Sequence, residues 1–207
     1  MDDIDVACNM TAVIGRTGKT TLILDLLTVA RRRYNNIDII VFSGDKSEND
    51  FYHEQTHVHC KHIGIAVDFW VIAQQRQSKK KCIVVFENMK LELWKDSRLR
   101  ELISHGGYFG VSCLFSIRDV TSLPLQCCKM ITHVFVMAQD TATTHCRVVY
   151  TKLFSHCMSF DAFCILLHTH AYNYTAMAFN ANTNTACSYL LQYKIENIPC
   201  YLHHLTT

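Results

Sequence analysis

A short glycine-containing turn near the N-terminus constrains the fold of this chain more than any other feature. The turn reads Gly15-Arg16-Thr17-Gly18-Lys19-Thr20-Thr21. It joins an apolar run of strand type, Thr11 to Ile14, to a helical stretch from Thr20 to about Arg33. In this position the backbone N–H groups at the helix N-terminus point toward an anion, and the helix dipole favours negative charge. The sequence therefore predicts a strand–turn–helix unit that binds phosphate.

The residues within the turn indicate a nucleoside triphosphate. In the pattern G-x-x-x-x-G-K-[ST], the lysine, here Lys19, contacts the β- and γ-phosphates, and the hydroxyl of Thr20 is a ligand of Mg²⁺. Val13 holds the first glycine position of that pattern, and counting from Gly15 makes the loop two residues shorter. A shorter loop offers fewer N–H groups, so we expect reduced affinity for ATP. The alternative is an ordinary glycine turn before a helix.

Runs of buried-strand type alternate with helical patterns through most of the chain. The expected strands are Thr11 to Ile14, Ile37 to Phe42, Cys82 to Phe86, Val111 to Phe115 and Ile131 to Met137. The expected helices are Thr20 to Arg33, Ile65 to Ser78, a helix around Leu99 to Ile103 that ends at Gly106-Gly107, and Phe160 to His170. Near-continuous apolar strands that alternate with helices are typical of a parallel sheet covered on both faces.

The last third of the chain has a different pattern. Tyr172 to Phe179 and Ala186 to Ile195 have strand character, and a polar stretch from Asn180 to Thr185 separates them, which favours an antiparallel hairpin. We therefore expect an α/β fold: a P-loop NTPase three-layer sandwich with a mainly parallel central sheet and a C-terminal antiparallel hairpin. Residues 1–207 are expected to form a single domain.

Composition limits the classes of partner and compartment. The formal net charge of +2 gives no strong general attraction to nucleic acid. The eleven cysteines are scattered through apolar segments and no signal peptide precedes them, so we expect a reduced, intracellular protein. No apolar run approaches the roughly 20 residues that span a bilayer, so we expect a soluble protein without a membrane partner.

A second motif is the apolar run from Cys82 to Phe86, which ends in Glu87 and Asn88. This is the form of a Walker B strand, whose acid lies next to the phosphate loop across the sheet and holds Mg²⁺. Glu87 is the candidate for this role. Asn88 stands where many ATPases have a second carboxylate; an amide can position water but cannot accept its proton at neutral pH.

With these two motifs, the chain resembles the poxvirus-type genome-packaging ATPases of the FtsK–HerA superfamily, from about Thr11 to about Phe179. A third region, Leu102 to Arg118, matches a helix, a turn and a strand of that family. Gly107 and Tyr108 stand where the family has Arg-His, and Arg118 stands where it has a sensor Gln. Arg118 can contact the γ-phosphate, since a guanidinium pairs well with phosphate oxygens, or it is a surface residue at a strand end.

The resemblance implies a ring-forming, ATP- and Mg²⁺-dependent motor that packages double-stranded viral DNA with capsid or portal-vertex proteins. It places the protein in an infected host cell, in the nucleus or a cytoplasmic factory, or in the virion. The alternative is an accessory or scaffold protein of virion assembly with weak or no ATPase activity, which Val13 and Asn88 favour. A small-molecule kinase or GTPase is disfavoured because the chain has no Asn-Lys-x-Asp motif and no arginine-rich lid.

Two further groups of residues are candidates for function. A ring motor needs an arginine finger, and the candidates are Arg98, Arg100 and Arg147. The segment from His53 to His62 contains four histidines and Cys60, which can bind zinc, but its spacing lacks the paired ligands of a zinc site. We interpret it as a polar surface loop and assign no metal beyond Mg²⁺.

Overall fold

The computed structural model describes residues 7, 10–43, 52, 59–62, 81–88, 95–137, 143–171 and 175–190. These residues form an eight-stranded sheet in the order β3-β2-β4-β5-β1-β6-β7-β8. The strands are β1 (Thr11–Ile14), β2 (Ile37–Ser43), β3 (His59–His62), β4 (Lys81–Glu87), β5 (Val111–Ile117), β6 (His133–Met137), β7 (Thr175–Asn180) and β8 (Thr185–Leu190). The strands from β3 to β6 in this order are parallel, whereas β7 and β8 form an antiparallel hairpin beside β6.

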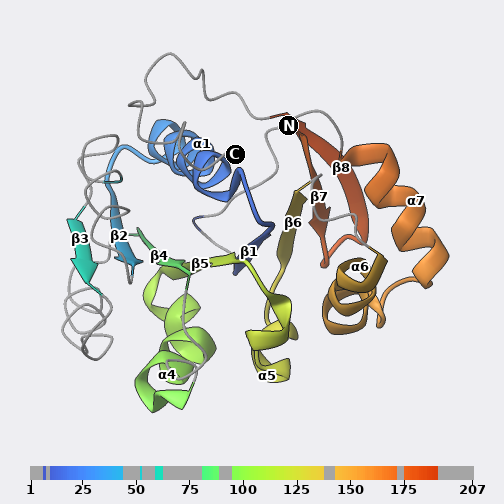
Figure 1. Cartoon of the computed structure of the whole chain (residues 1–207). Coiled ribbons are helices and arrows are strands. Elements are labelled where there is room, and N and C mark those ends of the chain that lie inside the picture. Colours follow the sequence, from blue (N-terminus) through green and yellow to red (C-terminus); the bar gives the residue numbers. More distant parts are fainter. Residues whose placement is uncertain are drawn as a thin grey trace.

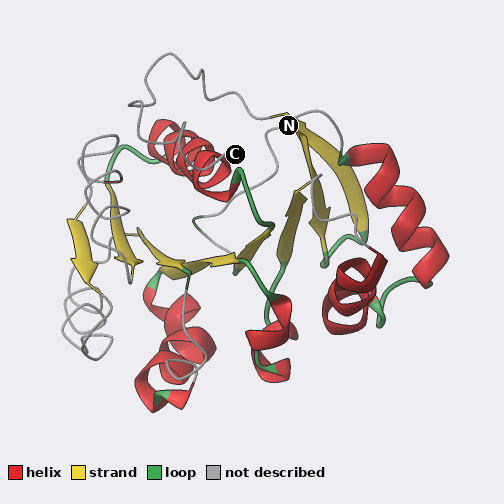
Figure 2. Ribbon diagram, viewed as in Figure 1, coloured by secondary structure: helices red, strands yellow, loops and turns green. Residues whose placement is uncertain are grey.

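Helices cover both faces of the sheet (Figures 1 and 2). The helices are α1 (Lys19–Arg33), α4 (Ser97–His105), α5 (Leu125–Cys128), α6 (Thr143–Val149) and α7 (Phe160–His170). Two 3₁₀ turns, η2 (Gly106–Phe109) and η3 (Val120–Ser122), and a π-helical turn, η5 (Tyr150–Phe154), complete the described elements. Helix α1 packs on one face, and α4, α5, α6 and α7 pack on the other. The expected three-layer α/β sandwich with a C-terminal hairpin is confirmed.

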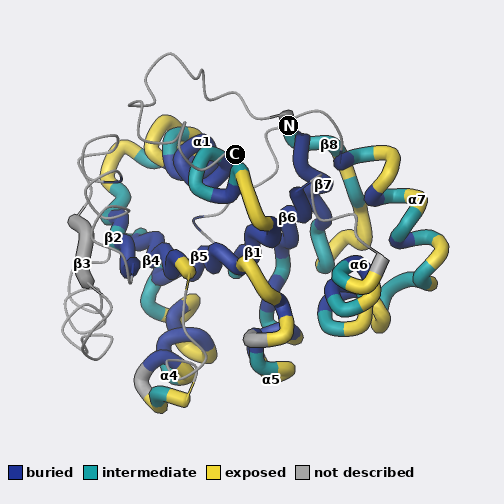
Figure 3. The backbone as a smooth tube through the Cα atoms, in the orientation of Figure 1, coloured by how far each residue is buried: buried dark blue, intermediate teal, exposed yellow. Residues whose placement is uncertain are grey.

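Burial of both faces explains the near-continuous apolar strands. All four residues of β1 are buried: Val13 joins the core beneath α1, and Ala12 and Ile14 join the core on the opposite face. Figure 3 shows the same pattern for β4 and β5, which are dark blue along their length. A strand with both faces covered has no solvent side, so alternation of polar and apolar residues disappears.

A ladder of phenylalanines crosses the middle of the sheet. Phe42, Phe86 and Phe115 are register partners on β2, β4 and β5, on the face away from α1. Their rings are stacked, with centroids 5.5 Å apart between Phe42 and Phe86 and 5.3 Å apart between Phe86 and Phe115. Stacked rings at matched positions favour one register of the three strands over a shifted one.

The cysteines on the helix-rich face are packing residues. Cys82, Cys113, Cys127 and Cys128 are free and buried. Burial raises the pKa of Cys82 to about 12 and that of Cys127 to about 11, so both thiols stay protonated at neutral pH. A protonated, buried thiol behaves as a small hydrophobic side chain, as the sequence indicated.

Some elements differ from the sequence-based expectation. His59–His62, interpreted as part of a polar loop, forms the edge strand β3, which pairs in parallel with β2. Helix α6 and turn η5 were not expected, because Thr143–Phe154 is short and rich in β-branched residues with weak helix propensity. The helix expected over Ile65 to Ser78, like His53 and His57, lies outside the described residues. Within the described part of the chain no group of three or more potential metal ligands gathers, and no helix there is long and apolar enough to cross a bilayer.

The helix-rich face depends on a cluster of aromatic side chains. Phe154 of η5 is fully buried, and its ring lies 4.7 Å from that of Phe163 and 5.0 Å from that of Phe179. We predict that Phe154→Ala lowers the free energy of unfolding by about 3–5 kcal/mol, because it removes a large buried side chain and leaves a cavity. Urea unfolding measures this loss. Ile165→Ala, at a position of α7 that is 65% exposed, is the control and should change stability by less than about 0.5 kcal/mol.

Candidate functional site

The glycine turn lies between β1 and α1, as the sequence predicts. Strand β1 ends at Ile14, and the backbone N–H of Gly15 donates to the carbonyl of Ile117 at the end of β5, at 3.1 Å. Gly18 has φ 78° and ψ −8° and immediately precedes α1, whose first hydrogen bond runs from Leu22 N to Gly18 O at 3.0 Å. The turn therefore comprises residues 15–18, and it delivers the chain directly into the N-terminus of a 15-residue helix.

Gly18 is required by the backbone conformation of this turn. A residue with a Cβ atom pays about 1–2 kcal/mol in the left-handed region. A Cβ on Gly18 would also lie 2.7 Å from Cε of Met137, at the end of β6. The flexible end of a methionine can move aside, so the dihedral angle is the stronger constraint. The close approach nevertheless shows that the turn packs against the end of β6 as well as that of β5.

Exposure differs along the predicted phosphate-binding residues. Arg16 and Thr17 are exposed, and Thr20 and Thr21 are half-buried at the start of α1. Lys19 exposes only 6% of its surface, which is rare for a lysine. Val13 lies inside β1, fully buried and paired with Ser116 and Phe135. Val13 is therefore part of the sheet, and the turn itself is the short one counted from Gly15.

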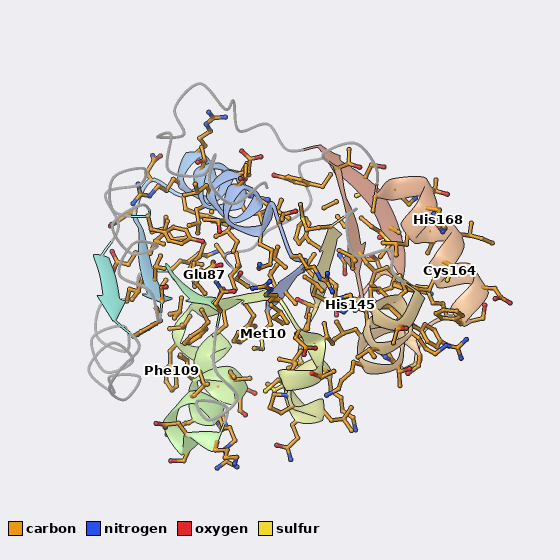
Figure 4. All side chains as sticks on the ribbon, in the orientation of Figure 1. Met10, Glu87, Phe109, His145, Cys164 and His168 are labelled. Carbon is orange, nitrogen blue, oxygen red and sulfur yellow. The ribbon has the colours of Figure 1, made fainter. Side chains whose placement is uncertain are left out.

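The acid of the second motif is buried at the end of β4. Glu87 is 1% exposed and points to the α1 side of the sheet, where Figure 4 labels it. Its Oε1 accepts a hydrogen bond from the hydroxyl of Ser116 at 2.6 Å, and its Oε2 accepts one from the hydroxyl of Tyr52 at 2.8 Å. Both oxygens of the carboxylate are therefore fixed by hydroxyl donors.

Glu87 ends β4 and the glycine turn follows β1, and these two strands are not neighbours. The sequence interpretation placed the acid next to the phosphate loop across the sheet, and in the structure β5 lies between β4 and β1. Ser116 of β5 is the register partner of both Glu87 and Val13, and it occupies the intervening position. The acid and the turn still end at the same edge of the sheet, because β1, β4 and β5 are parallel.

Asn88 and Arg118 both follow strands at this edge. Asn88 comes directly after Glu87, is exposed and has φ 48°, a left-handed conformation that asparagine tolerates better than most residues. Arg118 comes directly after Ile117, whose carbonyl accepts from Gly15, and it is exposed as well. The carboxyl edge of a parallel sheet is the usual place of ligand sites in α/β folds. The parallel strands therefore place Gly15–Thr21, Glu87, Asn88 and Arg118 along one edge.

The side chains at this edge suit a magnesium–nucleotide ligand. Mg²⁺ prefers oxygen ligands, and the hydroxyl of Thr20 and the carboxylate of Glu87 are oxygen donors. Carboxylates that bind metal ions are commonly hydrogen-bonded themselves, as both oxygens of Glu87 are. The turn and the amine of Lys19 supply the positive field that phosphates need.

Sequence reasoning missed Tyr52 and Ser116. Ser112 and Ser116 are four residues apart in β5, and an even separation in a strand places both on one face. The structure shows that this face is the α1 side, because Leu114 between them packs in the core beneath α1. Tyr52 stands in a polar stretch with no local pattern, and only the tertiary structure brings it to Glu87.

The arginine-finger candidates have other contacts within the chain. The guanidinium of Arg147, on α6, lies 4.8 Å from the ring centroid of Phe160. Arg100, on α4, donates from Nη2 to the carbonyl of Lys95 at 3.3 Å and is exposed. The side chain of Arg98 lies outside the described part. The choice among the three stays a prediction.

Comparison with known proteins places the chain by structure and not by sequence. No protein-family model matches it, and no curated protein sequence is similar to it. Solved structures are similar. The DNA-packaging ATPase B204 of Sulfolobus turreted icosahedral virus has a TM-score of 0.68 at 12% identity, over 89% of this chain and 98% of that one.

Two other solved structures have the same architecture. The genome packaging NTPase B204 of Sulfolobus turreted icosahedral virus 2, in complex with ATP-gammaS, has a TM-score of 0.62 at 12% identity, over 88% of this chain and 97% of that one. EssC (ATPases 2 and 3) of Geobacillus thermodenitrificans has a TM-score of 0.63 at 13% identity, over 93% of this chain and 41% of that one. At such identities the likeness establishes the fold: the chain has the P-loop NTPase fold of these viral packaging and EssC-type ATPases.

Proposed function

We propose that this chain binds ATP with Mg²⁺ at the carboxyl edge of the sheet and hydrolyses it to drive the packaging of double-stranded viral DNA. One observation carries the proposal. The left-handed Gly18 turn, with the buried Lys19 behind it, opens at the same edge as the buried, doubly hydrogen-bonded Glu87. Burying a lysine and a carboxylate near one edge costs desolvation free energy that an apolar pair would avoid. In a ligand with phosphates and a cation, the phosphates would contact Lys19 and the cation would contact Glu87.

Each residue has a separate task in this proposal. Backbone N–H groups of residues 15–18 and the start of α1 cradle the phosphates, and Lys19 neutralises charge between the β- and γ-phosphates. Thr20 and Glu87 would hold Mg²⁺, which supplies charge neutralisation to the phosphoryl group when bound. Asn88 would orient the attacking water, and Arg118 would contact the γ-phosphate.

The DNA-packaging part of the proposal rests on likeness of fold. B204 is a DNA-packaging ATPase and covers 89% of this chain. By that likeness we propose a homo-oligomeric ring that acts on double-stranded DNA together with capsid or portal-vertex proteins, in the infected cell or the virion. The small net charge of +2 means that DNA contacts would come from a local basic surface and not from the chain as a whole.

A second function is favoured by two features of the same edge that differ from the usual ATPase motifs. The turn spans residues 15–18 only, and Asn88 cannot take a proton from water at neutral pH. A chain with these features can bind nucleotide slowly or weakly and serve as an accessory or scaffold protein of virion assembly. The two functions differ in turnover, which one assay measures.

Hydrolysis of ATP by the purified chain, with and without double-stranded DNA, tests the proposal. We expect DNA-stimulated turnover that Lys19→Ala and Glu87→Gln each reduce by roughly a hundredfold or more, since each removes a group that stabilises the transition state. Lys129→Ala is the matched control, because Lys129 is an exposed lysine after α5. Nucleotide binding without turnover would favour the scaffold function. If no preparation binds nucleotide and none hydrolyses it, the proposed site is refuted.

A prediction of stability follows from the contacts of Glu87. Tyr52→Phe and Ser116→Ala each leave an oxygen of the buried carboxylate without its hydroxyl donor, which should cost about 1–3 kcal/mol of unfolding free energy. Tyr150→Phe is the control, since the Tyr150 hydroxyl donates at 3.0 Å to a neutral acceptor, Met158 O, in a half-buried place. Urea unfolding of all three variants measures the difference.

The Glu87→Gln background separates this effect from general loss of packing. If the hydroxyl of Tyr52 acts through the charge of Glu87, Tyr52→Phe should lower the free energy of unfolding less in the Glu87→Gln background than in the parent chain. A double-mutant cycle measures this difference. An unchanged cost, or a cost no larger than that of Tyr150→Phe, would contradict the assignment.

A further inference from the structure

The segment that follows Arg118 has a defined shape. The carboxylate of Asp119 accepts from Thr121 N at 2.9 Å and caps the 3₁₀ turn η3. Val120 and Leu123 are fully buried, and Leu123 N donates to Val120 O at 3.1 Å. Arg118 therefore stands between two fixed points: Ile117, held by Gly15, and the turn of residues 119–123.

Lys152, from the π-helical turn η5, holds the C-terminal end of this turn. The Nζ of Lys152 donates to the carbonyl of Leu123 at 2.7 Å and to that of Thr121 at 3.3 Å. These carbonyls lie at the C-terminal end of η3, where a helical turn leaves its oxygens without partners inside the turn. The ammonium group satisfies both of them with charge-assisted hydrogen bonds.

Lys152 is supplied by the π-helical turn η5, which continues α6. The hydrogen bond from Ser155 N to Tyr150 O, at 2.9 Å, closes the wide turn. Phe154 is buried against Phe163 and Phe179, and the ring of Tyr150 packs on that of Phe160 at 5.2 Å. The backbone segment that carries Lys152 is therefore anchored in the aromatic core. π-Helical turns within helices are frequent at functional sites.

The charges around the turn agree with this contact. The pKa of the Asp119 carboxyl is lowered, first by the hydrogen bonds from Thr121 and further by the positive charges of His145 and Lys152. Helix α6 carries His145 and leads into η5 with Lys152, and it lies on the same face of the sheet as α5 (Figure 1). The turn after Arg118 thus lies against a basic side of the α6–η5 unit.

We propose that Lys152 is a positioning residue for Arg118. By fixing residues 119–123 to the α6–η5 unit, it holds the backbone of Arg118 beside the Gly15 turn, so that the guanidinium reaches the γ-phosphate of bound ATP. This inference rests on the proposed nucleotide site. It adds that a contact in the helix-rich layer, away from the phosphate turn, controls the step in which the γ-phosphate is transferred.

The test compares Lys152→Met, which keeps the aliphatic stem and removes the donor, with Lys152→Arg, which keeps a donor. We expect Lys152→Met to lower kcat for ATP between about tenfold and a hundredfold, since a small misplacement of a group that contacts the γ-phosphate has this effect. Lys152→Arg should recover most of the loss. Lys129→Met is the control and should hydrolyse ATP like the parent chain.

A double variant separates positioning from general destabilisation. If Lys152 acts through Arg118, then Lys152→Met in an Arg118→Met background should cause little further loss of kcat. The ratio of affinities for ATPγS and ADP, measured without turnover, should fall alike in the two single variants. Thermal melting of each variant shows that it is folded, and Lys152→Gln replaces Lys152→Met if the latter does not fold.

Two outcomes would overturn the role of Lys152 and leave the proposed function standing. One is a kcat for Lys152→Met equal to that of Lys129→Met, and the other is a double variant in which the two single losses of kcat multiply. A parent chain that binds no nucleotide would overturn the proposed function, and this role of Lys152 with it. The parent chain is therefore measured first, which keeps the two failures distinguishable.

Discussion

The register of three parallel strands, held by a ladder of phenylalanines, underlies the whole candidate site. Phe42, Phe86 and Phe115 stack on the face away from α1. The next residue of each strand points to the opposite face, which places Ser43, Glu87 and Ser116 in one row toward α1. A shift of one residue in β4 would put the Glu87 carboxylate in the aromatic core and the Phe86 ring on the α1 face, and a shift in β2 or β5 would exchange a phenyl ring for a serine in the same way. Apolar packing on one face thus fixes the polar row on the other.

That polar row connects the acid to the phosphate turn through β5. Ser116 binds Glu87 through its hydroxyl and is the register partner of Val13 in β1. The next residue, Ile117, accepts the N–H of Gly15, and Arg118 follows. Strand β5 therefore carries three of the contacts that position the site. The same carboxyl end of β5 leads into the turn that Lys152 holds, so the central strand links the edge with the glycine turn to the helix-rich layer.

The sequence predicts the fold well because the fold depends on patterns of short range. The strand runs, the glycine turn before α1 and the hairpin are all local signals, and each lies where it was expected. Local signals fail where tertiary contacts decide the structure. Tyr52 reaches Glu87 across 35 residues, and His59–His62 becomes a strand because β2 offers a free edge position. The order β4-β5-β1, which separates the acid from the turn, is likewise invisible in the sequence. The π-helical turn that carries Lys152 is a departure from regular periodicity, so no periodic pattern indicates it.

Three residues that differ from the usual motifs lie at the surface, whereas two charged residues that match them are buried. Asn88, Arg118 and Tyr108 are exposed, and of the three only Asn88 has a left-handed backbone conformation that favours its residue type. Lys19 and Glu87 are buried, and buried charged groups add less to stability than apolar residues of similar size often do. Their positions at one edge of the sheet agree with the proposed nucleotide site. The exposed departures bear on how water is activated and how the γ-phosphate is sensed, which are steps after binding. In the proposed site the retained groups would act in nucleotide binding, and turnover would depend on how well Asn88 and Arg118 replace the usual groups.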